Sequence, residues 1–137
     1  MDLSEDQVRQ VASVAAAHGL AMVLLFGSTV AGGEHARSDR DVAVQYAGTP
    51  ADFRGLARLQ HALQEVFPER EVDLAVINRA DPLFLKKITE CCELVYGDPR
   101  ALEELKIYAF KRYQDHRRFF AMERAYVERF LRERAVR

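Results

Sequence analysis

Three aspartates stand at the start of two apolar stretches of the sequence: Asp39 directly before 40–46, Asp41 within it, and Asp73 within 71–77. Residues i and i+2 of a strand project to the same face, so we expect the carboxylates of Asp39 and Asp41 to lie together. Like charges this close repel each other, and a divalent cation such as Mg²⁺, which takes oxygen ligands, removes the conflict. If 71–77 forms the neighbouring strand, Asp73 faces the same pocket. Three such carboxylates predict a metal-dependent site for phosphoryl or nucleotidyl transfer.

A Gly-Ser pair, Gly27 and Ser28, directly follows the apolar run 21–26 and precedes the first aspartate by about ten residues. Glycine lets the backbone approach a phosphate closely, and the N–H groups of a helix that starts at the serine would point at that phosphate. Alone, a Gly-Ser turn or an Asp-x-Asp pair is a common feature of strand ends. Their combination in this order predicts a site that binds a nucleotide through its phosphates.

Hydrophobic periodicity places these residues among alternating strands and helices. The first helix is predicted over 4–18, where Ser4 is a candidate N-cap, Gln7 stands at the capping-box position and Gly19 ends the helix. Short apolar runs predict strands at 21–26, 40–46, 71–77 and 93–97. Apolar residues at helical spacing predict further helices at 51–66, from Pro82 onward, and over 99–134 in one or two pieces. Strands mixed with helices indicate an α/β fold.

Length and composition are those of one soluble domain. The chain has 137 residues, of which 49% are hydrophobic and 30% are charged. No apolar run approaches the roughly 20 residues of a membrane helix. The acidic, polar N-terminus is unlike a secretory signal, and the adjacent Cys91 and Cys92 make a poor disulfide framework. We therefore expect a cytoplasmic protein without membrane contact.

Charge is distributed unevenly along the chain. Residues 106–137 contain ten Lys or Arg against four Asp or Glu, a net +6, whereas the whole chain carries −1. This segment is either a solvated arginine-rich helix or a docking face for an acidic protein or nucleic acid. Lys86 and Lys87 are expected on a solvated face, the alternative being contact with phosphates.

The sequence resembles the nucleotidyltransferases of the DNA polymerase beta superfamily. Among them it is most similar to the minimal nucleotidyltransferases (MNT, MntA-like), which are antitoxin partners of HEPN ribonuclease toxins. The resemblance covers roughly residues 5–97 and rests on FGSTVAG at 26–32, SDRDVAV at 38–44 and EVDLAVI at 71–77. It implies a small mixed β-sheet of the polymerase beta type flanked by helices. In this interpretation, 1–97 form the nucleotidyltransferase core and 98–137 a basic, partner-facing helical extension of the same domain.

The resemblance also implies roles for the site residues. Asp39 and Asp41 correspond to the metal-binding pair, and Asp73 to the third carboxylate, which also orients or deprotonates the attacking hydroxyl. Gly27 and Ser28 correspond to the turn that binds the triphosphate. The implied cofactor is Mg²⁺, as two ions, and the implied substrate is ATP. The implied reaction transfers AMP to a hydroxyl, expected to be a tyrosine, of a HEPN toxin in a hetero-oligomer, without direct binding of nucleic acid.

The chain departs from the family pattern in the loop after Gly-Ser. Family members commonly carry arginines at the positions that Thr29 and Ala31 occupy here. We expect Arg37, or Arg40 if the strand is twisted, to supply the nucleotide-binding cation, unless a partner does so.

Two other functions are consistent with the sequence. The missing arginines and the basic, aromatic segment 106–137 are compatible with a non-catalytic antitoxin that masks its partner. Transfer to a small molecule such as an aminoglycoside is a third interpretation, although the chain is short for a separate acceptor domain.

Overall fold

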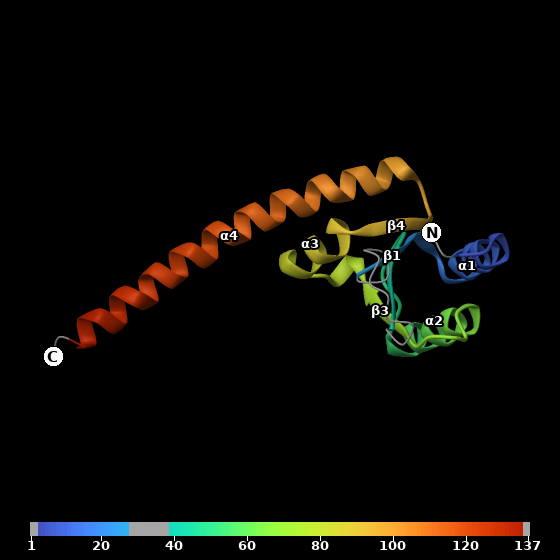
Figure 1. The fold of residues 1–137 in the computed structure, drawn as a ribbon, viewed down its shortest axis with the longest axis horizontal. Coiled ribbons are helices and arrows are strands. Elements are labelled where there is room, and N and C mark those ends of the chain that lie inside the picture. Colours follow the sequence, from blue (N-terminus) through green and yellow to red (C-terminus); the bar gives the residue numbers. More distant parts are fainter. Residues whose placement is uncertain (1–2, 28–38, 136–137) are drawn as a thin grey trace.

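Four strands form one mixed sheet that carries helices on both faces (Figure 1). The computed structural model describes residues 3–27 and 39–135. In chain order, the elements are α1 (Glu5–His18), β1 (Leu20–Phe26), β2 (Arg40–Tyr46), α2 (Phe53–Val66), β3 (Val72–Val76), the 3₁₀ helix η1 (Ile77–Arg79), α3 (Pro82–Glu90), β4 (Cys92–Tyr96) and α4 (Pro99–Ala135). This confirms the predicted α/β class with a small mixed sheet and a long C-terminal helix.

The strands lie in the order β3-β2-β1-β4. β1 is antiparallel to both β2 and β4, whereas β2 and β3 are parallel. Parallel neighbours need a crossover connection, and α2 provides it. Consequently the last residue of β1 and the first residues of β2, β3 and β4 meet at one end of the sheet.

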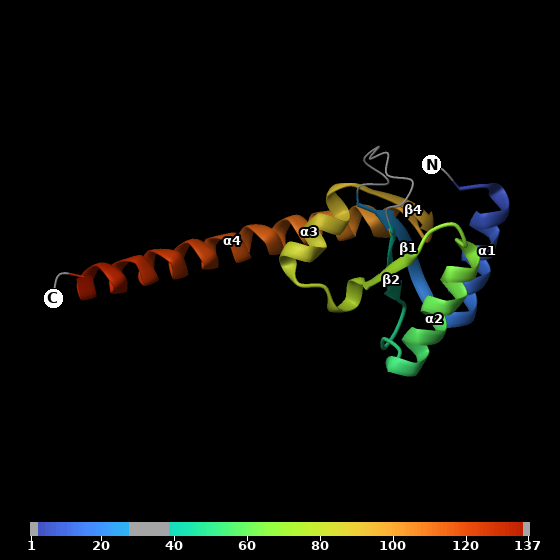
Figure 2. The same cartoon turned by 60° about the horizontal axis from the view of Figure 1, so that its bottom comes forward.

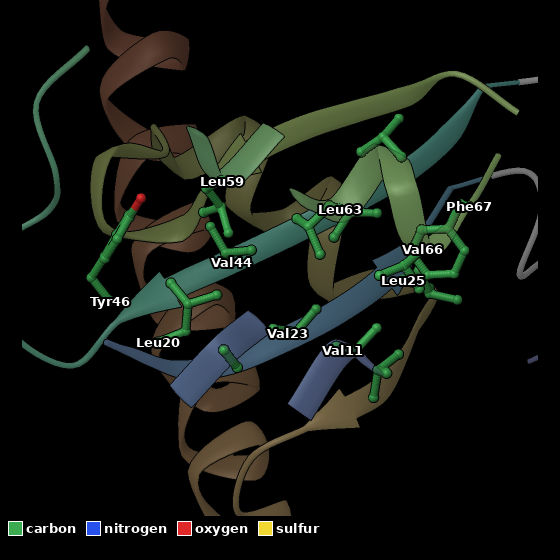
Figure 3. Packing of buried hydrophobic residues seen from close by; sticks show 14 residues of the cluster. Val11, Leu20, Val23, Leu25, Val44, Tyr46, Leu59, Leu63, Val66 and Phe67 are labelled. Atoms are coloured by element: carbon green, nitrogen blue, oxygen red, sulfur yellow. The ribbon is translucent and has the colours of Figure 1, made fainter. Parts of the chain in front are cut away.

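One face of the sheet is covered by α1 and α2 (Figure 3). Alternate residues of the strands, such as Leu25 on β1 and Val44 on β2, pack here against Val11 of α1 and Leu63 of α2. All four of these side chains are buried. This layer fixes the direction of every strand side chain, because neighbours along a strand must point to the opposite face.

The other face is covered by α3 and the first turns of α4 (Figures 1 and 2). Phe26 of β1 and Ala43 of β2 contribute to this second cluster, together with Ile88 of α3 and Leu105 of α4. The two clusters thus assign odd-numbered residues of β2 to the side of α3 and even-numbered residues to the side of α2.

Side-chain caps stand at the start of α1, α2 and α3. Ser4 caps α1 and forms the predicted capping box with Gln7, and Gly19 ends the helix in a left-handed conformation at φ 68°. Asp52 accepts a hydrogen bond from the backbone N–H of Gly55 at the start of α2. Asp81 caps α3 in the same way, and Pro82 occupies the first turn, where a missing N–H does no harm.

α4 is one continuous helix of 37 residues that extends beyond the sheet (Figure 2). Its buried residues are Leu102, Leu105 and Ala109, all in the first three turns. From Arg117 to Ala135 every residue is exposed. Within 3–27 and 39–135, no helix combines the length and the hydropathy that crossing a membrane requires.

Candidate active site

Asp41 and Asp73 stand side by side on the parallel strands β2 and β3. They are direct partners in the strand register, as are the flanking residues Val42 and Leu74. Val42 belongs to the cluster under α1 and α2, so Asp41 and Asp73 both project to the face that carries α3. The neighbouring-strand arrangement that the sequence suggested is therefore present.

The charges of the other two predicted carboxylates act on Asp41. Burial raises the pKa of Asp41 above its ordinary value, and the negative charge of Asp73 raises it further. Lys87 of α3 opposes this effect, and Asp39 adds a smaller increase in the same direction as Asp73. Asp39 lies just before β2 and is exposed. Ionising Asp41 is thus disfavoured by its surroundings, which is the electrostatic condition that a bound cation relieves.

The donor set suits a hard divalent cation. Carboxylate oxygens are the ligands that Mg²⁺ takes, commonly one or two of them together with phosphates of the substrate. Among the residues that the structure describes, no three His, Cys, Asp or Glu side chains converge closely enough to form a metal-binding group. The structure thus brings Asp41 and Asp73 together, whereas the predicted convergence of all three carboxylates is not seen among the described residues.

Gly27 lies directly beside Asp41 at the end of β1. Its φ is +86°, a conformation that favours glycine, and a Cβ at this position would collide with the Asp41 carboxylate. The backbone of Gly27 thus borders the carboxylates with no side chain between them, which leaves the close approach that a phosphate needs. The other two predicted nucleotide-binding residues, Ser28 and Arg37, lie outside the described residues.

Arg40 does not take the predicted role on the nucleotide side. Its side chain is buried on the face of α2, where the guanidinium carbon lies 5.0 Å from the centroid of the Phe67 ring. The alternation that places Asp39 and Asp41 on one face places Arg40 on the other. The suggestion that Arg40 contacts phosphate was wrong, because successive side chains of a strand point to opposite faces of the sheet.

A pocket of about 310 Å³ opens next to Asp73 along β3 and the start of α3. Phe26 and Phe84 lie on its aromatic side, with ring centroids 6.2 Å apart in an edge-to-face pair. Arg79 and Asp81 contribute charged groups to the same pocket. Sequence reasoning missed this pocket, because it forms between an edge strand and a helix whose relative position no local pattern encodes.

Lys87 of α3 is exposed, which confirms the expectation that it lies on a solvated face. Its positive charge lowers the pKa of Asp41, against the effect of burial.

Solved structures with the same fold extend over nearly the whole chain. A chain from a crystal structure of a toxin–antitoxin with AMP-PNP matches with a TM-score of 0.71 at 21% identity, covering 90% of this chain and 98% of that chain. A chain from the complex of tri-AMPylated Shewanella oneidensis HEPN toxin with MNT antitoxin matches with a TM-score of 0.68 at 18% identity, covering 94% and 99%. A structure of spectinomycin adenyltransferase AAD(9) from Enterococcus faecialis, with ATP and spectinomycin, matches with a TM-score of 0.52 at 17% identity. This match covers 75% of this chain and 59% of that chain.

The sequence itself matches a family model. No curated protein sequence matches the chain. The family described as "Polymerase beta, Nucleotidyltransferase" matches residues 9–101, a segment that spans all four strands and includes Gly27 and the three aspartates. On this match over more than half of its length, the chain belongs to the polymerase beta nucleotidyltransferase family.

Proposed function

We propose that this protein is a Mg²⁺-dependent adenylyltransferase that moves AMP from ATP to a hydroxyl of a HEPN toxin and thereby neutralises it. The observation that carries the proposal is the placement of Asp41 and Asp73 side by side, next to Gly27. Support for the nucleotide and the partner comes from the matched structures, one with AMP-PNP and one with an AMPylated HEPN toxin. Free thiols at Cys91 and Cys92 are compatible with a reducing compartment, so we place the protein in the cytoplasm.

In the proposed reaction, the acceptor oxygen attacks the α-phosphorus of ATP and forms a new P–O bond. The bond from the α-phosphorus to the bridging oxygen of the β-phosphate breaks, and pyrophosphate leaves with the bonding electrons. Asp73, which borders the 310 Å³ pocket, accepts the proton of the attacking hydroxyl. Mg²⁺ held by Asp39 and Asp41, with Asp73, would supply positive charge against the phosphates. Gly27 keeps the phosphate path free of side-chain atoms.

We place the acceptor hydroxyl in the pocket beside Asp73. Phe26 and Phe84 provide an aromatic wall, against which another ring can pack edge-to-face. Arg79 and Asp81 lie in the same pocket and can hydrogen-bond to a polar group or backbone near that ring. An aromatic hydroxyl, a tyrosine of the partner, fits these surroundings best.

The distal part of α4 is the surface that we assign to the toxin. It exposes large apolar side chains over 119–131, among them Phe119, Met122, Tyr126 and Leu131. Exposed apolar groups in such number are typical of an interaction surface. The net positive charge of 106–137 favours a partner with acidic groups on the matching face.

The test uses ATP labelled at the α-phosphate, Mg²⁺ and a purified HEPN toxin from the same genome. Label should enter the toxin, and label at the γ-phosphate should not, since that phosphate leaves with pyrophosphate. Asp41→Asn should lower the transfer rate by at least about a hundredfold. Asp52→Asn is the matched control, because Asn caps α2 as well as Asp does. Undiminished transfer by Asp41→Asn would show that the assigned chemistry is wrong.

A non-catalytic antitoxin is the second candidate, and the exposed length of α4 is the observation that favours it. In that case, the double variant Asp39→Asn, Asp41→Asn protects cells from the toxin as well as the wild type does. Removal of 116–137 abolishes protection, while Leu102, Leu105 and Ala109 stay in the core. Loss of protection in the double variant, with the complex intact, would exclude masking as the mechanism.

A further inference from the structure

A groove of about 710 Å³ lies between the start of α3 and the side of α4. Leu83 forms its wall on α3, and the residues on α4 extend from Tyr113 to Glu128. Half of Leu83 is exposed, and Phe120 and Val127 on the opposite wall are 39% and 46% exposed. Among the described residues only these two helices line the groove, and α4 continues past α3 (Figure 2). The groove is therefore an apolar surface that this chain does not itself cover.

The α4 wall of the groove has a repeat of seven residues. Tyr113, Phe120 and Val127 are seven residues apart, and Arg117 and Arg124 stand between them with the same spacing. Alternating steps of four and three residues are the spacing of a coiled-coil seam, in which side chains insert between those of a facing helix. The shape and the spacing together predict that a helix lies along α4 in this groove.

The charges in the groove define the chemistry of that helix. Arg117 and Arg124 are exposed, and within 3–27 and 39–135 neither guanidinium lies within 4.0 Å of a carboxylate oxygen. Glu123 and Glu128 also line the groove and take the positions that flank the seam on its two sides. A complementary helix thus carries acidic residues in its seam and Lys or Arg at its flanks.

A second copy of this chain does not have these charges. Parallel pairing in register would set Arg117 and Arg124 against their own equivalents, and Glu123 against the equivalent of Glu128 five residues on. Antiparallel pairing would still bring together two segments 106–137, each with a net charge of +6. Nucleic acid is disfavoured as well, because its phosphates would meet both glutamates and the apolar side chains between the arginines.

We propose that the groove binds one amphipathic helix of the toxin, which sets apolar side chains against Phe120 and carboxylates against Arg117 and Arg124. Leu83 holds that helix from the side of α3, next to Tyr113. This inference rests on the proposed function, and it narrows the surface assigned to the toxin to one side of α4.

The experiment measures binding of the purified toxin to the full chain by calorimetry. The double variant Arg117→Glu, Arg124→Glu should weaken binding at least about a hundredfold, because like charges then meet in the seam. Phe120→Ala should weaken it about tenfold through the loss of an apolar anchor. The matched control, Arg118→Glu with Arg129→Glu, changes the net charge equally on the side of α4 that faces away from the groove. It should change the affinity less than about threefold.

A second measurement shows that the site at the sheet is unaffected by the substitutions. The ligand is Mg²⁺ with α,β-methylene-ATP, whose methylene bridge prevents transfer. Every variant should bind this analogue as the wild type does, because the substituted side chains lie outside the predicted nucleotide site.

Several results would overturn the inference. If the Arg117, Arg124 variant binds the toxin as tightly as the control variant does, the toxin helix does not lie in this groove. If both double variants lose affinity equally, net charge is the cause and not the seam. A dimer of the isolated wild type, or RNA binding by it, that the Arg117, Arg124 variant lacks would assign the groove to a second copy or to nucleic acid. A wild type that binds no toxin would refute the proposed function together with this inference, whereas transfer of AMP by a variant of normal affinity would refute the inference alone.

Discussion

Gly27 and Asp41 constrain each other at the point where β1 ends and β2 begins. The glycine adopts a φ of +86°, and the space where its Cβ would be belongs to the Asp41 carboxylate. A side chain at Gly27 therefore strains the backbone and displaces a predicted metal ligand at the same time. Backbone strain and the clash with Asp41 can be separated experimentally. Gly19 has a positive φ without a close neighbour, and Gly48 has neither.

We predict that Gly27→Ala lowers the free energy of unfolding by more than Gly19→Ala does. Gly19, at φ +68°, has open space around its Cβ position, so its substitution isolates backbone strain, about 1–2 kcal/mol. Gly48, with open space and no positive φ, should tolerate alanine within about 0.5 kcal/mol. Urea unfolding of the three variants measures the order. An effect at Gly27 no larger than that at Gly19 would mean that Asp41 moves aside freely.

The raised pKa of Asp41 predicts a pH-dependent effect on stability. A carboxyl whose pKa is raised in the folded state favours folding while it is protonated, below its ordinary value of 3.8. That contribution is lost as the pH rises through the raised value, so ionised Asp41 opposes folding at neutral pH. Asp41→Asn should therefore melt at a higher temperature than the wild type at pH 7 in EDTA.

The difference in melting temperature should shrink as the pH falls toward 4. Mg²⁺ with a nucleotide should reverse the order at neutral pH, because a ligand that binds the folded wild type alone stabilises it. Thermal melts across this pH range, with and without Mg²⁺ and α,β-methylene-ATP, measure both effects. A wild type that melts above Asp41→Asn in EDTA at every pH would contradict the electrostatic assignment.

Among the elements, α4 divides into a part that stabilises the fold and a part that does not. Leu102, Leu105 and Ala109 are buried against the sheet and α3. Tyr113 still contacts α3, because its ring centroid lies 4.8 Å from the ammonium of Lys86. The apolar periodicity continues past this point, but no sheet lies beneath it (Figure 1).

Deletion of 116–137 should leave the free energy of unfolding unchanged within about 0.5 kcal/mol, since it removes no buried residue. Leu105→Ala, the contrasting variant, should lower it by about 2–4 kcal/mol because it leaves a cavity in the core. Chemical denaturation compares the two proteins. Marked destabilisation by the deletion would show that the distal helix contributes to the fold of the isolated chain.

Local signals predicted the elements well. Ser4, Gln7 and Gly19 marked both ends of α1, and the alternation in 40–46 gave the bounds of β2 as observed. The stretch 71–77 was read as one strand, whereas β3 ends at Val76 and a 3₁₀ turn follows. Helix ends with caps and strands with clear alternation are encoded by adjacent residues, which is why a single sequence suffices for them.

Contacts between distant segments were predicted less well. That Asp73 neighbours Asp41 was a conditional expectation, because strand order and register depend on the packing of α2, not on either strand alone. The pocket beside Asp73 depends in turn on how Phe84 of α3 docks against Phe26. These placements follow from the assembled core. The sequence therefore predicts which residue types form the site, but it predicts only part of how they are arranged in space.

At the scale of the whole molecule, the sheet and the distal part of α4 lie in different regions (Figures 1 and 2). The carboxylates are at one end of the sheet, and the exposed helix extends past the body that holds them. We predict that Asp41→Asn binds the toxin normally but transfers no AMP. The protein without 116–137 should still bind Mg²⁺ and α,β-methylene-ATP but should lose the complex.

Size-exclusion chromatography of the mixed proteins and calorimetry with the nucleotide check these expectations. A truncated protein that forms the complex with unchanged affinity would place the toxin elsewhere on the surface.

Because α4 is one continuous helix, its length fixes how far its exposed residues lie from the core. At 1.5 Å per residue, Phe119 and Leu131 lie about 15 and 33 Å along the axis beyond Ala109, the last core residue. A partner that contacts this exposed segment and also places one side chain beside Asp73 must be large enough to reach both regions at once. Free tyrosine and short peptides cannot contact both regions at once, so we expect them to lack the binding energy that the distal part of α4 supplies.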